Sequence, residues 1–320
     1  MSLVDPARVA LAAFRLIPRL PQVVSRGAMR VVAYFAWLAH GSGVRRLESN
    51  LRRTRPDATR GQLRRLARAN MRNYLRYYAE AFILPRLSLA EIDARVRLVG
   101  AETPLAETAS GRSVILALGH QGNWDLAAAW ATAHLAPATT VAERLSPPEL
   151  FEEFVRMRAA LGVKVIPLDA GGDVFRELVR AVRAGPALVP LLADRDLTAR
   201  GVEVEMLGER ARVAAGPAAL AIATGTMLVP TLLRHERLRG ARRRAAGTPW
   251  GLVVTFCPPI PVVAGLPRSQ QVLRVTQAWV DVLGADIAEH PTHWHMLQKV
   301  FVADLDPARQ RVVRSAVGPT

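Results

Sequence analysis

Beyond Pro85 the sequence alternates between short apolar runs and longer stretches with a helical spacing of apolar residues. The run Val114–Leu118 has no polar position, which is the pattern of a strand buried on both faces, and a helical stretch follows it. Repetition of this unit predicts an α/β fold with a central, largely parallel sheet flanked by helices. The expected strands are Val114–Leu118, Thr140–Ala142, Val163–Leu168, Ala187–Leu192, Met227–Leu233 and Leu252–Phe256, and the expected helices are Asn123–Leu135, Pro147–Leu161 and Val174–Ala184.

The N-terminal quarter has a different pattern, with apolar residues on one side of helical stretches and arginines on the other. Helical spacing covers Pro6–Leu20, Val23–Leu38 and residues 59–84, and Pro18 and Pro21 separate the first stretch from the second. Interrupted amphipathic helices of this kind are typical of segments that lie in a membrane interface. The same helices can instead cover the core with their arginines in water, and the sequence leaves both possibilities open.

The net charge is concentrated in this quarter. The chain has 43 Lys and Arg against 27 Asp and Glu, a net +16, and residues 1–86 alone hold 17 arginines and four acids, a net +13. Residues 87–320 hold 26 bases and 23 acids. A basic segment attracts anionic lipid or nucleic acid. No helix-turn-helix, zinc-finger or RNP pattern accompanies the arginines, so we expect an anionic membrane surface as the partner and no nucleic acid.

Composition excludes several classes of protein. Half of the residues are hydrophobic, which predicts a folded core, and the single Cys257 rules out a disulfide framework and fits a reducing compartment. We find no secretory signal, and glycines and prolines divide the long run Val213–Leu233 into the pattern of a buried helix and a strand. We expect a peripheral membrane protein with a docking region over 1–86, an α/β body over 87–302 and a tail over 303–320.

One motif indicates chemistry. The segment Gly119–Asp125, Gly-His-Gln-Gly-Asn-Trp-Asp, places His120 at the carboxyl end of the first expected strand, where α/β proteins place their sites. A carboxylate folded back beneath an imidazole fixes its tautomer and leaves the other nitrogen free as a base. We therefore expect a general-base dyad of His120 and Asp125, with glycines keeping the turn open and Asn123 capping the helix. By spacing alone the motif is weak, because a histidine at a strand end is more often structural.

The motif and three later segments together carry a family resemblance. Gly119–Asp125 resembles the His-x-x-x-x-Asp signature of glycerolipid and lipid A type acyltransferases. The segments Leu192–Glu205, Ala214–Ala218 and His290–Gln298 resemble the actinobacterial phosphatidylinositol mannoside acyltransferases. The resemblance covers nearly the whole chain, roughly residues 5 to 302.

The resemblance implies an acyl-CoA-dependent O-acyltransferase at the cytoplasmic face of the plasma membrane. It would move a fatty acyl chain such as palmitoyl to the 6-hydroxyl of the mannose on inositol position 2 of phosphatidylinositol mono- or dimannoside. His120 would deprotonate the hydroxyl, which attacks the thioester directly, and Asp125 would orient the histidine. The family carries an acid, often Glu, at the position of Asp194, as a second partner of the histidine. Beyond the acyl-CoA donor, the resemblance implies no cofactor.

The resemblance also implies substrate contacts. It places Arg158, Arg195 and Arg200 near the CoA or a lipid phosphate, and Glu143 near the acceptor sugar. Each residue has a plainer explanation as part of a solvated helix face or a surface ion pair. Relatives often carry Glu where this chain has Ala223, so any contact made by that Glu is absent here.

Other functions remain open from the sequence. The same chemistry can act on a lysophospholipid or on another glycolipid. A non-enzymatic protein, in which His120 is structural and the basic quarter binds a membrane or nucleic acid, predicts indifference to acyl-CoA. The histidines of residues 290–295 lack accompanying carboxylates, so we expect them to pack in the core and expect no metal.

Overall fold

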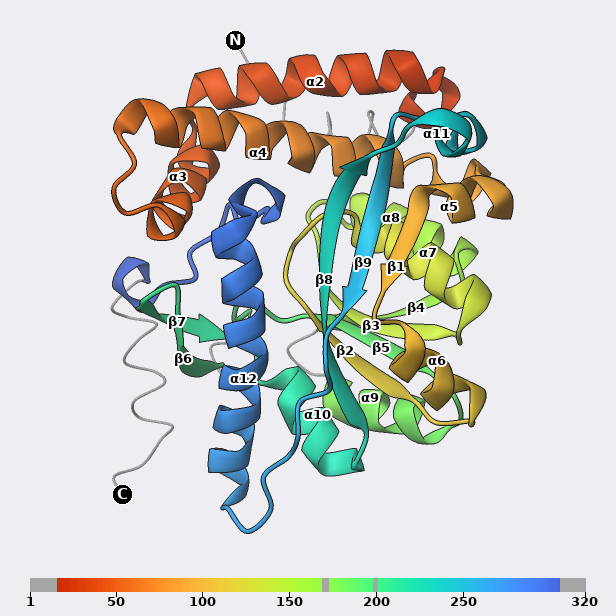
Figure 1. Cartoon of the computed structure of the whole chain (residues 1–320), viewed down its shortest axis with the longest axis vertical. Helices are drawn as coiled ribbons and strands as arrows, with labels where there is room; N and C mark the ends of the chain where they lie inside the picture. Colours follow the sequence, from red (N-terminus) through yellow and green to blue (C-terminus); the bar gives the residue numbers. More distant parts are fainter. Residues whose placement is uncertain (1–15, 169–172, 198–200, 306–320) are drawn as a thin grey trace.

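The computed structural model describes residues 16–168, 173–197 and 201–305. Its centre is a seven-stranded sheet in the order β1-β9-β8-β2-β5-β3-β4, in which the neighbouring strands are parallel except for β8 with β9 (Figure 1). The predicted α/β fold with a largely parallel sheet is confirmed. The strands are β1 (Val96–Val99), β2 (Val114–Leu118), β3 (Ala138–Glu143), β4 (Val163–Leu168), β5 (Leu188–Leu192), β8 (Met227–Arg237) and β9 (Trp250–Phe256).

Strand β2 occupies the middle of the sheet because its sequence suits burial on both faces. Its five residues are all buried, and they pair in register with β5 on one side and β8 on the other. Parallel strands that are covered on both faces consist of such uninterrupted apolar runs. The carboxyl end of β2 therefore lies in the middle of the sheet, next to the carboxyl end of β5.

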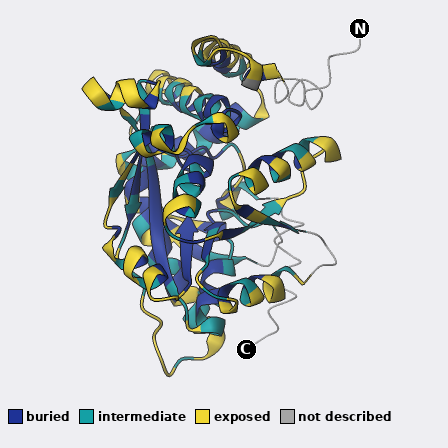
Figure 2. Cartoon of the chain, turned by 90° about the vertical axis from the view of Figure 1, so that its right-hand side faces the viewer, coloured by how far each residue is buried: buried dark blue, intermediate teal, exposed yellow. Residues whose placement is uncertain are grey.

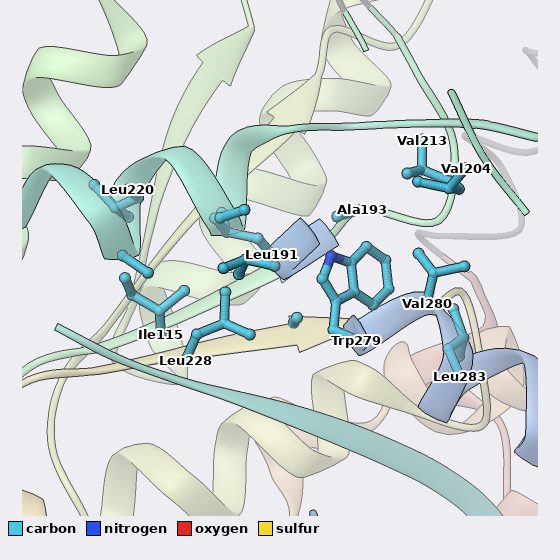
Figure 3. Close-up of a cluster of buried hydrophobic side chains, with 14 of the residues drawn as sticks. Ile115, Leu191, Ala193, Val204, Val213, Leu220, Leu228, Trp279, Val280 and Leu283 are labelled. Atoms are coloured by element: carbon cyan, nitrogen blue, oxygen red, sulfur yellow. The ribbon is translucent and has the colours of Figure 1, made fainter. Parts of the chain in front are cut away.

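Three helices and a hairpin cover one face of the sheet. They are α9 (Val174–Arg183), α10 (Gly216–Thr224), α12 (Arg268–Glu289) and the hairpin of β6 (Val202–Met206) and β7 (Glu209–Val213). Trp279 of α12 is fully buried in this layer, near Leu191 of β5 and Ala193 just beyond it (Figure 3). A buried side chain of this size contributes about 3–5 kcal/mol to stability.

The opposite face of the sheet is covered by α5 (Leu89–Arg95) and α7 (Trp124–His134). Around them lie α6 (Glu102–Ala109), α8 (Pro148–Ala160) and α11 (Gly240–Ala246) (Figure 1). Leu116 and Leu118 of β2 pack on this side with Leu126 of α7. Alternate residues of β2 thus belong to different layers, as the pleat of a strand requires.

Helices of the N-terminal quarter form a layer across one end of the sheet (Figure 1). They are α2 (Gln22–Ala39), α3 (Ser42–Thr54) and α4 (Arg60–Ala81), and α4 begins with a capping box of Thr59 and Gln62. Helix α4 lies between α2 and the rest of the protein, and exposed residues follow the outer sides of this layer (Figure 2). The helices expected over Val23–Leu38 and 59–84 are confirmed. Most of the stretch Pro6–Leu20 lies outside the described residues.

The strands and helices predicted for the body are also confirmed, and Val213–Leu233 divides as expected into α10 and β8. Strand β1, the β6–β7 hairpin and α12 were not predicted from the sequence, and neither were α3, α5, α6 and α11. The hairpin had a signal in the sequence, because Glu203, Glu205 and Arg210 alternate with apolar residues in the pattern of half-buried strands. Within the described ranges we find no helix that is both long and apolar enough to span a bilayer.

Candidate active site

The candidate base lies in a tight turn between β2 and α7. Asn123 is the N-cap of α7, and its side chain accepts a hydrogen bond from the backbone N–H of Leu126 at 2.9 Å. Gly122 has a φ of +56°, and a Cβ atom there would lie 2.8 Å from the carbonyl oxygen of Leu233. Only glycine tolerates this conformation so close to another backbone. The predicted cap is confirmed, and the turn fixes where His120 leaves the sheet.

His120 is held by the buried carboxylate of Asp194. Its Nδ1 lies 2.5 Å from Oδ1 of Asp194, and its backbone N–H donates to Oδ2 at 2.9 Å. The indole N–H of Trp294 donates to the same Oδ2 at 2.8 Å, so a side chain with 0% exposure is surrounded by donors. Burial by itself would raise the pKa of Asp194, but the contacts with His120 and Trp294 hold it below its ordinary value. Asp194 is therefore an ionised acceptor.

This arrangement leaves one imidazole nitrogen of His120 free to accept a proton. A carboxylate only accepts hydrogen bonds, so Nδ1 carries the proton and Nε2 keeps a free lone pair. The His120 side chain is 21% exposed and lines a cavity, whereas Asp194 lies behind it. The pair can take a proton from a hydroxyl group that binds in the cavity.

The expected hydrogen bond between His120 and Asp125 is not formed, and this part of the prediction is corrected. Asp125 accepts hydrogen bonds from Arg158 at 2.8 and 3.3 Å and from the Tyr77 hydroxyl at 2.7 Å. The helix already begins at Trp124, so the side chain of Asp125 projects from a helical position toward α4 and α8. The residue that orients His120 is Asp194. A catalytic contribution of Asp125 stays a prediction.

Arg158 forms an ion pair with Asp125 and has further N–H donors for another partner. Burial would lower the pKa of Arg158, yet the neighbouring Asp125 and Tyr77 raise it above its ordinary value. A guanidinium has five N–H donors, and Asp125 engages only part of them. Arg158 also lines the cavity, and its contact with a substrate phosphate stays a prediction.

One cavity of about 350 Å³, within the usual range for ligand pockets, brings most of the predicted site residues together. Its lining includes His120, Asp125, Glu143, Arg158 and Arg195. Asp194 lies behind His120, and Arg200 falls outside the described residues. The remaining lining is mostly apolar and includes Leu116, Leu118, Ala127, Ala128, Ala131, Phe154, Val163 and Leu188.

Glu143 and Arg195 pair with each other at the exposed end of this cavity. The Arg195 guanidinium donates to Glu143 at 3.0 Å, and their side chains are 21% and 52% exposed, respectively. Exposed ion pairs contribute only about 0–1 kcal/mol. The pair can therefore separate around a polar substrate at little cost.

A segment from the far end of the chain closes the site from behind. His295 N–H donates to the carbonyl of His120 at 2.7 Å, and Gly122 N–H donates to the carbonyl of His293 at 3.2 Å. Trp294, between these histidines, is fully buried. The sequence predicted packing for this segment, and the structure adds the indole hydrogen bond to Asp194. Sequence alone gives no signal for that bond, because it depends on a contact between distant parts of the chain.

Three neutral histidines lie close to this segment. The ring centres of His235 and His293 are 5.8 Å apart, and those of His235 and His295 are 6.4 Å apart. Burial lowers the pKa of all three, and burial together with the charges of Arg76 and Arg234 lowers the pKa of His293 to about 3. Over the described ranges, no group of three or more His, Cys, Asp or Glu residues has the geometry of a metal site.

A histidine paired with a buried carboxylate, on the wall of an apolar cavity with a charged entrance, is chemically suited to activate a hydroxyl beside an apolar substrate. Residues 7–302 match the family model described as bacterial lipid A biosynthesis acyltransferase. The chain belongs to this family, and the protein is an acyltransferase, as the sequence resemblance predicted.

Similar proteins include two mycobacterial enzymes. The chain is 35% identical to a phosphatidylinositol mannoside acyltransferase of Mycolicibacterium smegmatis over 299 residues, 93% of this chain and 92% of that protein. It is 36% identical to one of Mycobacterium tuberculosis over 307 residues, 95% of this chain and 91% of that protein. The solved structure of the 1-acyl-sn-glycerophosphate (LPA) acyltransferase PlsC from Thermotoga maritima aligns with a TM-score of 0.36 and 15% identity, covering 70% of this chain and 86% of that chain.

Separate substitutions of the two carboxylates test which one orients the base. Asp194→Asn is expected to lower kcat for acyl transfer on the order of 10⁴-fold, because the amide no longer fixes the tautomer of His120. Asp125→Asn leaves Arg158 buried without its anion and is expected to lower the free energy of unfolding by about 3–5 kcal/mol. Its pH–rate profile should keep the wild-type shape. A changed shape for Asp125→Asn alone would reverse the assignment.

The neutral histidines make stability depend on pH. In the unfolded chain a histidine has a pKa near 6.5, whereas the pKa values of His235, His293 and His295 are lowered on folding. Below that pH the unfolded state binds more protons, so these histidines should lower the free energy of unfolding as the pH falls, by up to about 1.4 kcal/mol per pH unit for His293, whose pKa is about 3.

Urea unfolding between about pH 7.5 and pH 5 measures this loss. His235→Gln should reduce the slope, because one histidine fewer is protonated on unfolding. His134→Gln, at the surface, serves as the matched control. An unchanged slope in His235→Gln would assign the acid sensitivity to other groups.

Proposed function

We propose that this acyltransferase moves a fatty acyl group such as palmitoyl from acyl-CoA to the 6-hydroxyl of the mannose on inositol position 2 of phosphatidylinositol mono- or dimannoside. The observation that carries the proposal is the pair of His120 and Asp194 on the wall of an apolar cavity. Relatives named phosphatidylinositol mannoside acyltransferases, at 35% and 36% identity over most of both chains, support the acceptor.

The proposed reaction needs one proton transfer and one displacement. Nε2 of His120 takes the proton of the mannose hydroxyl as the hydroxyl oxygen attacks the thioester carbonyl carbon. The ester C–O bond forms, the C–S bond breaks, and the proton passes from His120 to the departing CoA thiolate. Asp194 stays ionised and stabilises the imidazolium between these events. No acyl-enzyme and no further cofactor take part.

The apolar part of the cavity is suited to the acyl chain. Ala127, Ala128 and Ala131 of α7 form one wall, and Leu116 and Leu188 of the sheet form another. Alanines on the helix leave room that larger side chains would fill. Each buried methylene of a chain gains about 0.8 kcal/mol, so a long acyl group binds more tightly until the cavity is full.

The charged end of the cavity is suited to the acceptor and to CoA. Arg158 and Arg195 offer donors to phosphate oxygens, and Glu143 offers an acceptor to sugar hydroxyls. We include Arg200, whose sequence neighbourhood supports the same role. Together these groups would place the mannose hydroxyl within reach of His120.

Helix α2 supplies a surface for docking onto the membrane. Its exposed apolar residues include Val23, Val24, Val31, Val32, Phe35 and Leu38. Three arginines, Arg30, Arg68 and Arg72, line a groove between α2 and α4 beside this surface. Apolar side chains next to cations match the acyl chains and head groups of anionic lipid. We propose that this docking surface holds the enzyme at the cytoplasmic face of the plasma membrane.

Acyl transfer tests the proposed reaction. Purified protein incubated with palmitoyl-CoA and phosphatidylinositol mono- or dimannoside should yield a product heavier by one acyl chain, detected by mass spectrometry. His120→Ala should abolish the product, because the proposed reaction needs the imidazole to take the proton of the attacking hydroxyl. Competition with lysophospholipid and other glycolipids then identifies the acceptor. Equal turnover by His120→Ala, or preferred acylation of another acceptor, would refute the assignment.

Vesicle binding tests the docking surface. Replacing Arg30, Arg68 and Arg72 together with Gln should weaken binding to phosphatidylinositol-containing vesicles by about 10²-fold, since each arginine near an anionic surface is worth about 1 kcal/mol. Phosphatidylcholine vesicles should bind both proteins weakly.

The matched control replaces the exposed arginines Arg176, Arg180 and Arg183 of α9 with Gln. This variant loses the same charge from another part of the molecule (Figure 1). If it lost as much affinity as the first variant, net charge rather than the surface of α2 would explain binding.

A further inference from the structure

Helix α4 carries a row of four polar side chains on the side that faces the active site. Asn70, Asn73, Tyr77 and Glu80 are three or four residues apart, so they lie along one side of the helix. Asn73 is half-buried and the others are buried. Polar groups in such positions need partners. The partners of this polar row belong to the two segments that hold His120.

The first half of the polar row binds the segment behind the histidine. The side-chain amide of Asn70 donates to the carbonyls of Pro291 at 3.1 Å and Trp294 at 2.6 Å. That of Asn73 donates to the carbonyl of Thr292 at 2.9 Å. The same segment donates in turn to the base and to its orienting carboxylate. Helix α4 therefore fixes the backbone that carries the Trp294 indole.

The second half of the polar row binds the start of α7. The Tyr77 hydroxyl donates to Asp125 at 2.7 Å, and the carboxylate of Glu80 accepts from the Asn123 side chain at 2.9 Å. Burial would raise the pKa of Glu80, but the charge of Arg76 and the hydrogen bond from Asn123 are among the contacts that lower it. An ionised acceptor therefore holds the N-cap that ends the turn of His120.

We propose that the polar row of α4 is a positioning element for catalysis, because it holds the turn of His120 both from behind and at the start of α7. This inference rests on the proposed role of His120 as the base. Asn70, Asn73 and Glu80 do not line the cavity. They act through other residues, and a shift of the base by about 1 Å can cost on the order of 10²-fold in rate.

Asn50 of α3 offers a matched control. Its side-chain amide donates to the carbonyls of Met296 and Gln298, each at 2.9 Å, and it is 1% exposed against 0% for Asn70. Both asparagines thus bridge two carbonyls of the same stretch of chain. The residues bound by Asn50 line the cavity, but the residues whose groups donate to His120 and Asp194 are Trp294 and His295, in the stretch that Asn70 holds. Loss of either amide should lower the free energy of unfolding by a similar amount. A difference in kcat or in the His120 resonance between the two variants therefore reports on the positioning of His120.

The experiment compares Asn70→Ala with Asn50→Ala. Asn70→Ala is expected to lower kcat about 10- to 100-fold with little change in KM for palmitoyl-CoA. In ¹⁵N-histidine-labelled protein, the ring N–H resonance of His120, identified by its loss in His120→Ala, should shift or broaden. Asn50→Ala should keep this resonance and the shape of the pH–rate profile. If Asn70→Ala does not fold, Asn73→Ala, which loses one bond at a half-buried site, replaces it, with Asn73→Gln as the conservative variant.

An unchanged resonance and kcat in the folded α4 variant, or equal changes in both variants, would overturn the inference and reduce the polar row to a contribution to stability. The resonance is measured without substrate. If the wild-type enzyme fails to acylate phosphatidylinositol mannoside, the proposed function fails, while the spectra still decide whether α4 positions His120.

Discussion

The hydrogen bond between His120 and Asp194 is the contact on which the site depends, and the register of the sheet creates it. Leu118 of β2 pairs with Leu192 of β5, and the histidine and the aspartate each follow two residues later. Two parallel strands in this register carry both side chains to the same sheet edge. A slip of one residue would turn one of them to the other face. The central apolar strands thus determine the geometry of the pair of His120 and Asp194.

Placing a carboxylate in the core has consequences for the rest of the chain. An unpaired buried charge is very costly, so Asp194 needs donors, and it receives them from the imidazole and backbone of His120 and from Trp294. Trp294 belongs to the same buried cluster as Trp279 of α12. Its position is set by α4, which packs against α2. Catalytic geometry, core packing and the N-terminal helices are therefore parts of one connected structure.

The sequence was sufficient to predict the fold and to single out His120 as a candidate base, but not to predict the contacts around it. Uninterrupted apolar runs identify buried strands, and the resemblance named Asp194 as a partner of His120. The partner of Asp125 could not be predicted, because it depends on whether α7 begins before or after that residue. The polar row of α4 was hidden for another reason. Asn70 and Glu80 have the same sequence pattern whether they face water or the carbonyls and side chains of another segment.

The position of α4 also affects how this protein can change during evolution. One side of α4 carries arginines such as Arg65 and Arg72 toward solvent, and the other carries the polar row toward the active site. Exposed positions can accept substitution with little effect on the interior. Insertion or deletion of one residue is different, because it rotates every following side chain by about 100° around the helix axis. That rotation would turn arginines toward the turn of His120, so α4 should vary in composition among relatives while its length stays constant.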